Sequence, residues 1–265
     1  MKRKLGTCWG FAGPLPKDER ITLMKENGFV TTFMGSEAKD LGELVKYIRA
    51  AGIDVDNYHA PFDKINDIWK PGEEGDAMYA RLLDGVEKCV KYDVPAIVVH
   101  LSSGLKPPVV NEVGFERWSR LQQIADDNGV LLCYENQRML SNLAMAFEQF
   151  PKAAFCWDCG HESCFTPGRH YMPLYGSKLK ALHIHDNWGK FNGDDHMIPY
   201  EASMDFDYVA EMIAASKYEG TLMLELIKHK SGYYEETPSE EYARRAGLAA
   251  ARLAAAVEKF DEKYV

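Results

Sequence analysis

Six residues whose side chains bind metal ions or transfer protons stand at the ends of short apolar segments in this sequence. They are His59 in NYHAPF, His100 in VVHLSSG, Glu135 in CYENQ, Asp158 in FCWDCGH, His183 in LHIHDN and Glu225 in MLELI. A set of carboxylates and imidazoles suits a divalent ion such as Mn, Mg, Co, Zn or Fe. The same groups can serve as general acids and bases.

The alternation of side chains along a strand predicts that all six residues face the same way. Successive residues of a strand point to opposite faces. Counting back in twos from the six gives mostly small or apolar residues, such as Val98, Cys133, Cys156 and Ala181. Such residues can fill the interior of a barrel, so we expect the six polar side chains to point inward at one rim.

The six side chains could be solvated residues at the rim of the barrel, or they could bind a metal ion. Their number at one rim distinguishes the two possibilities. A single histidine or glutamate at a strand end is most often a solvated residue or a local hydrogen-bond partner. Six at one rim are different, because three of them are carboxylates that repel one another. Buried charges must be paired or coordinated. The sequence therefore favours a bound cation.

The segments that carry these residues alternate between short apolar strands and helices. Strands are predicted at residues 4–10, 29–34, 53–59, 96–101, 130–135, 153–158, 179–186 and 221–226. Helices are predicted at residues 18–27, 41–51, 76–92, 113–128, 205–216 and 239–260, with shorter ones at 140–150 and 170–177. Gly28, Gly52 and Gly129 follow helices and suit the left-handed backbone position found there.

Eight such units predict an α/β fold, a (β/α)8 TIM barrel with a parallel eight-stranded barrel and outer helices. An open doubly wound sheet is the alternative. No Pro/Gly/Ser-rich linker divides the chain, so residues 1–265 are expected to form a single domain. The longest predicted loops, 60–75, 159–169 and 187–204, follow strands and would open at the C-terminal face, where TIM barrels carry their chemistry.

Composition limits the classes of function. The net charge of −9 argues against nucleic-acid binding, which needs a basic surface. The basic N-terminus is not followed by a long apolar run, so no signal peptide or membrane span is expected. Six cysteines in 265 residues are not a disulfide framework, and we expect a cytoplasmic protein.

On these residues the chain resembles the xylose-isomerase-like superfamily of sugar and sugar-phosphate isomerases and epimerases, which also includes endonuclease IV. The four metal ligands of that family, Glu, Asp, His and Glu on strands five to eight, fall on Glu135, Asp158, His183 and Glu225. Four shorter motifs of the family are also present. They are Asp-x-x-His at Asp158 and His161, His-x-x-Asp at His183 and Asp186, Asp-x-His at Asp194 and His196, and His-Ala-Pro at His59-Ala60-Pro61.

The resemblance implies an isomerase or epimerase that acts on a small sugar or sugar phosphate and needs a divalent ion, Mn, Co, Mg or Zn. Glu135 and Glu225 would be the base and acid that move a proton through an enediolate, and His161 would hold the substrate oxygen that gains negative charge. A homo-oligomer is possible. A lyase or dehydratase of keto-sugars or inositol derivatives would use the same residues.

A second class is a phosphodiesterase that resembles endonuclease IV, with three zinc ions. The counterparts of its full ligand set are His59, His100, Glu135, Asp158, His161, His183, Asp194, His196 and Glu225. A binding barrel without catalysis is the third alternative. The sequence departs from the family where Glu201-Ala202-Ser203 replaces the usual glycines and where His185 replaces a frequent lysine.

Several other residues are weaker candidates. Trp9, Trp188 and His185 are predicted to contact substrate, although packing explains the tryptophans equally well and His185 could instead hydrogen-bond a metal ligand. Cys156-x-x-Cys159 matches a zinc or redox spacing, but parity turns only Cys156 inward. Basic residues near strand ends could bind phosphate, with a solvated surface role favoured for each: Lys17, Lys106, Arg138 and Lys228.

Overall fold

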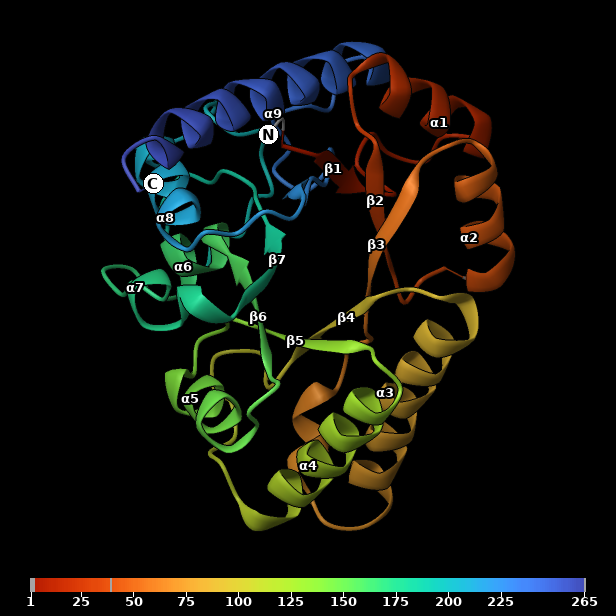
Figure 1. The fold of residues 1–265 in the computed structure, drawn as a ribbon, viewed down its shortest axis with the longest axis vertical. Helices are drawn as coiled ribbons and strands as arrows, with labels where there is room; N and C mark the ends of the chain where they lie inside the picture. The colour runs from red at the N-terminus through yellow and green to blue at the C-terminus, as the bar shows by residue number, and fades with distance from the viewer. Residues whose placement is uncertain (1–2, 39, 265) are drawn as a thin grey trace.

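Parallel strands alternate with helices along the chain and surround a central axis (Figure 1). The computed structural model describes residues 3–38 and 40–264. The strands are β1 Leu5–Cys8, β2 Thr31–Gly35, β3 Asp54–His59, β4 Ala96–His100, β5 Leu131–Glu135, β6 Ala154–Asp158, β7 Leu179–His183 and β8 Leu222–Leu224. The helices are α1 Lys17–Glu26, α2 Leu41–Ala50, α3 Glu73–Tyr92, α4 Glu112–Asp127, α5 Leu140–Gln149, α6 Cys159–Phe165, α7 Met172–Tyr175, α8 Phe206–Ala215 and α9 Ser239–Asp261, with 3-10 turns η1 Ile65–Trp69 and η2 Gly176–Lys178.

The strand order shows how the sheet closes. Each strand pairs in parallel with its neighbours in the order β7-β6-β5-β4-β3-β2-β1-β8. A parallel bridge joins Ile184, which follows β7 directly, to Leu224, the last residue of β8. Its hydrogen bonds run from Ile184 N to Met223 O and from Glu225 N to Ile184 O, both at 2.9 Å. The barrel prediction is therefore confirmed, and the open sheet is excluded.

Apolar side chains form two separate clusters. The larger one fills the space between the strands and the helices, where α9 runs from α1 to α8 along the top of Figure 1. The smaller one lies inside the barrel and consists of Ala96, Val98, Cys133, Ala154, Cys156 and Ala181. All six are positions that the alternation of side chains assigned to the interior, so that prediction is confirmed.

The predicted boundaries need three corrections. Residues 159–169 were expected to be a loop, but α6 begins directly after β6, because Asp158 Oδ1 accepts a hydrogen bond from His161 N at 2.6 Å and caps the helix. Strands β1, β7 and β8 end two or three residues earlier than predicted. The segment expected at 170–177 is two short turns, α7 and η2, rather than one helix.

The glycines after helices behave as expected. Gly28, Gly52 and Gly129 have φ angles of 80°, 79° and 71°, in the left-handed region that glycine enters without a steric penalty. In the part of the chain that the structure describes, no helix is both long enough and apolar enough to cross a membrane.

Candidate metal centre

Strand register brings the predicted ligands together at the C-terminal rim of the barrel. Within the paired strands, His100 of β4 lies opposite Glu135 of β5, and Asp158 of β6 lies opposite His183 of β7. Glu225 follows β8 directly, and its backbone is fixed by the hydrogen bond to Ile184. Neighbouring strands thus place one potential ligand each at the same level.

The four ligands expected from the family pattern form one group. One ligand atom each from Glu135, Asp158, His183 and Glu225 lies within 4.8 Å of every other. His183 Nδ1 is 3.3 Å from Glu135 Oε2 and 3.5 Å from Glu225 Oε2. Oxygen and nitrogen ligands about 2.0–2.2 Å from an ion are roughly 2.8–3.6 Å apart at octahedral or tetrahedral angles. The spacing therefore fits a divalent ion between these side chains.

Unpartnered polar atoms give an independent test of that fit. Both ring nitrogens of His183 and Oδ2 of Asp158 are buried without a hydrogen-bond partner among the described residues. A buried polar group without a partner costs about 1–3 kcal/mol. A coordinated cation would satisfy the carboxylate oxygen and one imidazole nitrogen, so the donor set fits such an ion.

The charges at the rim interact strongly. Burial opposes the charged form of His183, but Glu225 and Glu135 outweigh it and raise the pKa of His183 to about 9. Burial by itself raises the pKa of Glu135, yet the neighbouring His100 and His183 outweigh burial and hold that pKa well below its usual range. The protonated form of His183 is thus favoured beside these carboxylates, and a bound cation would compete with that proton.

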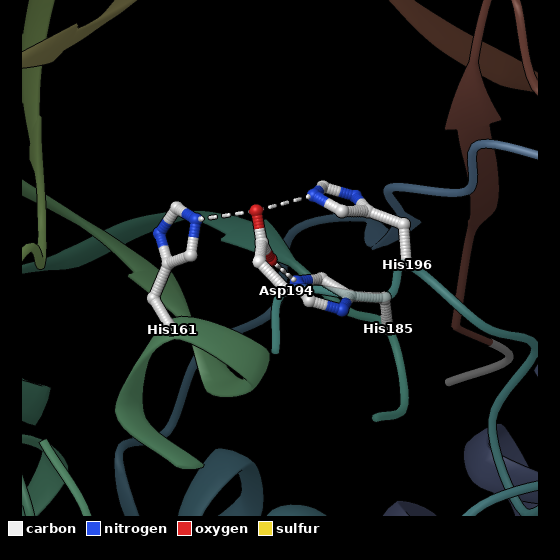
Figure 2. A group of neighbouring side chains, drawn as sticks. All are labelled: His161, His185, Asp194 and His196. Atoms are coloured by element: carbon white, nitrogen blue, oxygen red, sulfur yellow. Dashed lines mark hydrogen bonds and ion pairs between the residues drawn. The ribbon is translucent and has the colours of Figure 1, made fainter. Parts of the chain in front are cut away.

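A second group of potential ligands consists of His161, His185, Asp194 and His196 (Figure 2). Asp194 reaches in from the loop after β7 and lies among three imidazoles (Figure 2). Its Oδ2 is 3.2 Å from His196 Nε2 and 3.7 Å from His161 Nε2, and its Oδ1 is 3.6 Å from His185 Nε2. His185 Nε2 also lies 3.2 Å from Asp158 Oδ1, which joins the two groups.

Histidines from β3 and β4 complete a third group around Glu135. His59 Nε2 and His100 Nε2 lie 3.3 and 3.1 Å from Glu135 Oε2. Gln137 was not singled out from the sequence, but its Nε2 lies 3.3 Å from His100 Nε2 and 3.0 Å from His161 Nδ1. Gln137 follows Glu135 by two residues, so the same parity argument could have found it.

These groups open into a pocket of about 530 Å³ with aromatic walls. The predicted residues that line it are Trp9, His59, His100, Glu135, His161, Asp194, His196 and Glu225. Asp158, His183 and His185 lie beneath the lining and are fully buried. Three aromatic residues missed in the sequence also line the pocket and pack against histidines of the rim: Phe33 stacks on His183, Phe62 lies tilted against His100, and Phe165 stacks on His161.

The weaker candidates are placed as follows. Trp188 is 44% exposed and contacts Tyr233 instead of lining the pocket, so its contact with substrate stays a prediction. His185 does not line the pocket, and its Nε2 lies 3.2 Å from Asp158 Oδ1 and 3.6 Å from Asp194 Oδ1, so its contact with substrate stays a prediction. Cys156 lies inside the barrel and Cys159 begins α6, and both thiols are free.

The four basic residues that were considered as phosphate ligands differ in their exposure. Lys17 and Lys106 are exposed. Lys228 is only 5% exposed, so the surface role favoured for it was wrong. Arg138 is partly buried and lines the pocket, although a surface role was favoured for it as well.

The fold and the rim of carboxylates and histidines define a TIM barrel with a candidate metal centre. Residues 21–252 match the family described as xylose isomerase-like TIM barrel, and the chain belongs to that family. A curated relative, the uncharacterized protein y4fM of Sinorhizobium fredii, is 33% identical over 107 residues, which are 38% of this chain and 34% of that protein. This chain thus spans about a third of the length of that relative.

Solved structures share the whole fold at low sequence identity. An L-ribulose 3-epimerase matches with a TM-score of 0.75 and 16% identity, over 100% of this chain and 97% of its own. A 3-keto-D-glucoside 4-epimerase from E. coli matches with a TM-score of 0.71 and 18% identity, over 95% and 99%. The IolI protein with a bound zinc atom matches with a TM-score of 0.75 and 16% identity, over 97% and 99%.

Proposed function

We propose that this protein is a divalent-metal-dependent sugar isomerase or epimerase that transfers a proton through an enediolate of its substrate. One observation carries the proposal: Glu135, Asp158, His183 and Glu225 form a buried donor group with unpartnered atoms beneath a pocket of sugar size. Two of the similar structures are sugar epimerases by title, and another carries zinc, which supports both parts of the proposal.

The protein's own residues supply the proton transfer. A divalent ion held by the four ligands would act as a Lewis acid toward adjacent carbonyl and hydroxyl oxygens of a sugar. Glu135 and Glu225 both line the pocket, and one of them takes the proton from the carbon next to the carbonyl. The other glutamate returns a proton to the opposite face of that carbon, which gives an epimer, or to the neighbouring carbon, which gives an isomer.

The other pocket residues orient the substrate and exclude water. His161 lies 2.8 Å from Glu135 and lines the pocket, where it would donate a hydrogen bond to the substrate oxygen that gains negative charge. Trp9, Phe33 and Phe62 form apolar walls for a sugar ring. A dehydratase of keto-sugars or inositol derivatives would need the same base and acid, with loss of a hydroxyl group instead of reprotonation at carbon.

The second candidate function is a phosphodiesterase that resembles endonuclease IV. The observation in its favour is the presence of two further donor groups, one with His161, His185, Asp194 and His196 and one with His59, His100 and Glu135. Three ions could occupy the rim if each group held one. The net charge of −9 opposes binding of a nucleic-acid backbone, so we rank this function second.

A screen of ketoses in deuterated water tests the leading proposal. The protein is loaded with manganese, and each sugar is followed by mass spectrometry and NMR. We expect at least one ketose to acquire deuterium at the carbon next to the carbonyl as it is converted. A product that forms without solvent label would point to hydride transfer and contradict the two-glutamate mechanism.

A further inference from the structure

One of the basic side chains that line the pocket, Arg138, has no acidic partner among the residues that the structure describes and could bind an anionic ligand. Arg138 and Lys230 both line the pocket, but Lys230 Nζ is paired with Asp194 Oδ2 at 2.6 Å. Arg138 bonds to a neutral group instead: its Nε and Nη2 donate to Asn192 Oδ1 at 3.0 and 2.9 Å. Within residues 3–38 and 40–264 no carboxylate forms an ion pair with Arg138, so its positive charge is not neutralised.

The guanidinium of Arg138 is held in a fixed position. It lies 3.5 Å from the centre of the Phe165 ring, within the range of a cation–π contact. Asn192 itself is fixed, since its N donates to Cys164 O at 2.9 Å. Nη1 makes no hydrogen bond in the described part of the chain. A planar guanidinium fixed on one edge presents its remaining donors in a defined direction, as recognition of a carboxylate or phosphate requires.

The same aromatic ring connects Arg138 to the metal centre. Phe165 also stacks on His161, with ring centroids 4.5 Å apart. His161 Nδ1 lies 2.8 Å from Glu135 Oε1 and 3.4 Å from Asp158 Oδ2. The rings of Phe165 and His161 thus stand between Arg138 and Glu135. All four residues line the same pocket, so one sugar derivative in the pocket can contact both ends.

A second arginine faces the same region. Beside the pocket lies a hollow of about 350 Å³, lined by Arg138, Phe165, Thr166, Pro167, Gly168 and Arg169. Arg169 is exposed, and among the described residues it has no ion pair. The hollow contains no acidic residue. Two arginines that line one hollow, neither in an ion pair among the described residues, are suited to an anionic group.

We infer that Arg138 and Arg169 form an anion-binding subsite next to the metal centre, and that the substrate carries a phosphate or carboxylate group. This inference rests on the proposed function for the position of the sugar, while the anion subsite itself depends only on the two arginines. A phosphate monoester and a sugar acid share the chemistry that the subsite recognises, and small probes can distinguish them.

Calorimetric titration of the full chain, stripped of metal with EDTA and then desalted into a chloride buffer free of EDTA, tests the subsite without any contribution from a metal. The probes are glycerol 3-phosphate, glycerate and uncharged glycerol. The variants are Arg138→Gln and Arg169→Gln, with Arg252→Gln as the matched control, because Arg252 also stacks on an aromatic ring, 3.7 Å from the centre of Tyr200. Arg169 makes no side-chain hydrogen bond in the described residues, so its variant keeps the fold even if the Arg138 variant loosens the Asn192 loop.

We expect the wild type and the Arg252 variant to bind at least one anion and to ignore glycerol. Loss of either subsite arginine should weaken the binding about tenfold or more, as for a charge-assisted hydrogen bond. Preference for glycerol 3-phosphate assigns a phosphate, and preference for glycerate assigns a carboxylate. Equal binding by all four proteins, or no binding of either anion, overturns the inference. A manganese titration of the same protein without EDTA is run in parallel. If manganese does not bind while an anion does, the proposed metal-dependent function is contradicted and the anion-binding subsite remains supported.

Discussion

The interior of the barrel and its C-terminal rim are built from the same strands but have opposite character. In the interior, small apolar side chains pack against one another as a separate cluster. Two residues further along each strand, the rim carries ionisable side chains. The corresponding pairs are Val98 and His100, Cys133 and Glu135, Cys156 and Asp158, and Ala181 and His183.

The interior and the rim, the two layers of the barrel, differ in whether their buried groups have the partners that they need. Interior side chains need no partner beyond van der Waals contact, and their burial contributes about 25 cal/mol per Å². At the rim, buried atoms of His100, Asp158 and His183 lack hydrogen-bond partners within the described residues. The interior therefore stabilises the barrel, while the rim leaves buried polar atoms that a bound ligand would satisfy. Substitutions in the two layers should accordingly have different consequences.

The largest expected effect comes from replacing a rim carboxylate. Glu225→Gln keeps the size of the side chain but removes the group that exchanges a proton, so turnover should fall at least about 100-fold. Steady-state kinetics on the ketose found in the screen measures this effect. Glu219→Gln is the control, because Glu219 is exposed and lies before β8. If Glu225→Gln retains more than a tenth of the wild-type rate, Glu225 is not a catalytic residue.

A smaller effect is expected from the histidines outside the four-ligand group. In the isomerase mechanism, His100→Ala and His196→Ala keep one bound ion per chain and reduce activity about 10–100-fold, as loss of groups that support metal ligands does. Elemental analysis of each variant gives the count. About three zinc ions in the wild type, fewer in each variant, and incision of an abasic duplex would favour the phosphodiesterase.

The smallest functional effect belongs to the interior. Val98→Ala removes buried methyl groups and should lower the free energy of unfolding by about 1–3 kcal/mol. The manganese dissociation constant should change less than about twofold, because Val98 contributes no ligand atom to any of the donor groups. Urea unfolding and a manganese titration measure the two quantities. A large loss of metal affinity would show that the layers are not independent.

Much of this arrangement could be predicted from the sequence because alternation along strands is a local property. Once His100, Glu135, Asp158 and His183 are placed at strand ends, their neighbours two residues back must face the interior. The four-ligand group followed from the same argument and from the family pattern. The position of Glu225 depends on one backbone bridge, Ile184 with Leu224, which the sequence does not reveal.

The remainder of the site depends on tertiary contacts. Helix α6 was missed because Asp158, read as a ligand, also caps the helix. Phe33, Phe62 and Phe165 could not be distinguished from core aromatic residues, since only the folded pocket places their rings against histidines. For Arg138, a surface role was favoured because its neutral partner, Asn192, lies 54 residues away in the loop after β7.

Metal content is the most direct test of the central claim, that the rim of this barrel holds a divalent ion. The protein is stripped with EDTA, incubated with manganese, desalted and measured by elemental analysis. His183→Gln is compared with the control His229→Gln, which changes an exposed histidine outside the rim. We expect about one tightly held ion per chain in the wild type and the control, and none in His183→Gln, since His183 supplies a buried ligand that no other residue replaces. Wild-type protein that retains no ion, with manganese as with cobalt, magnesium and zinc, would contradict the account.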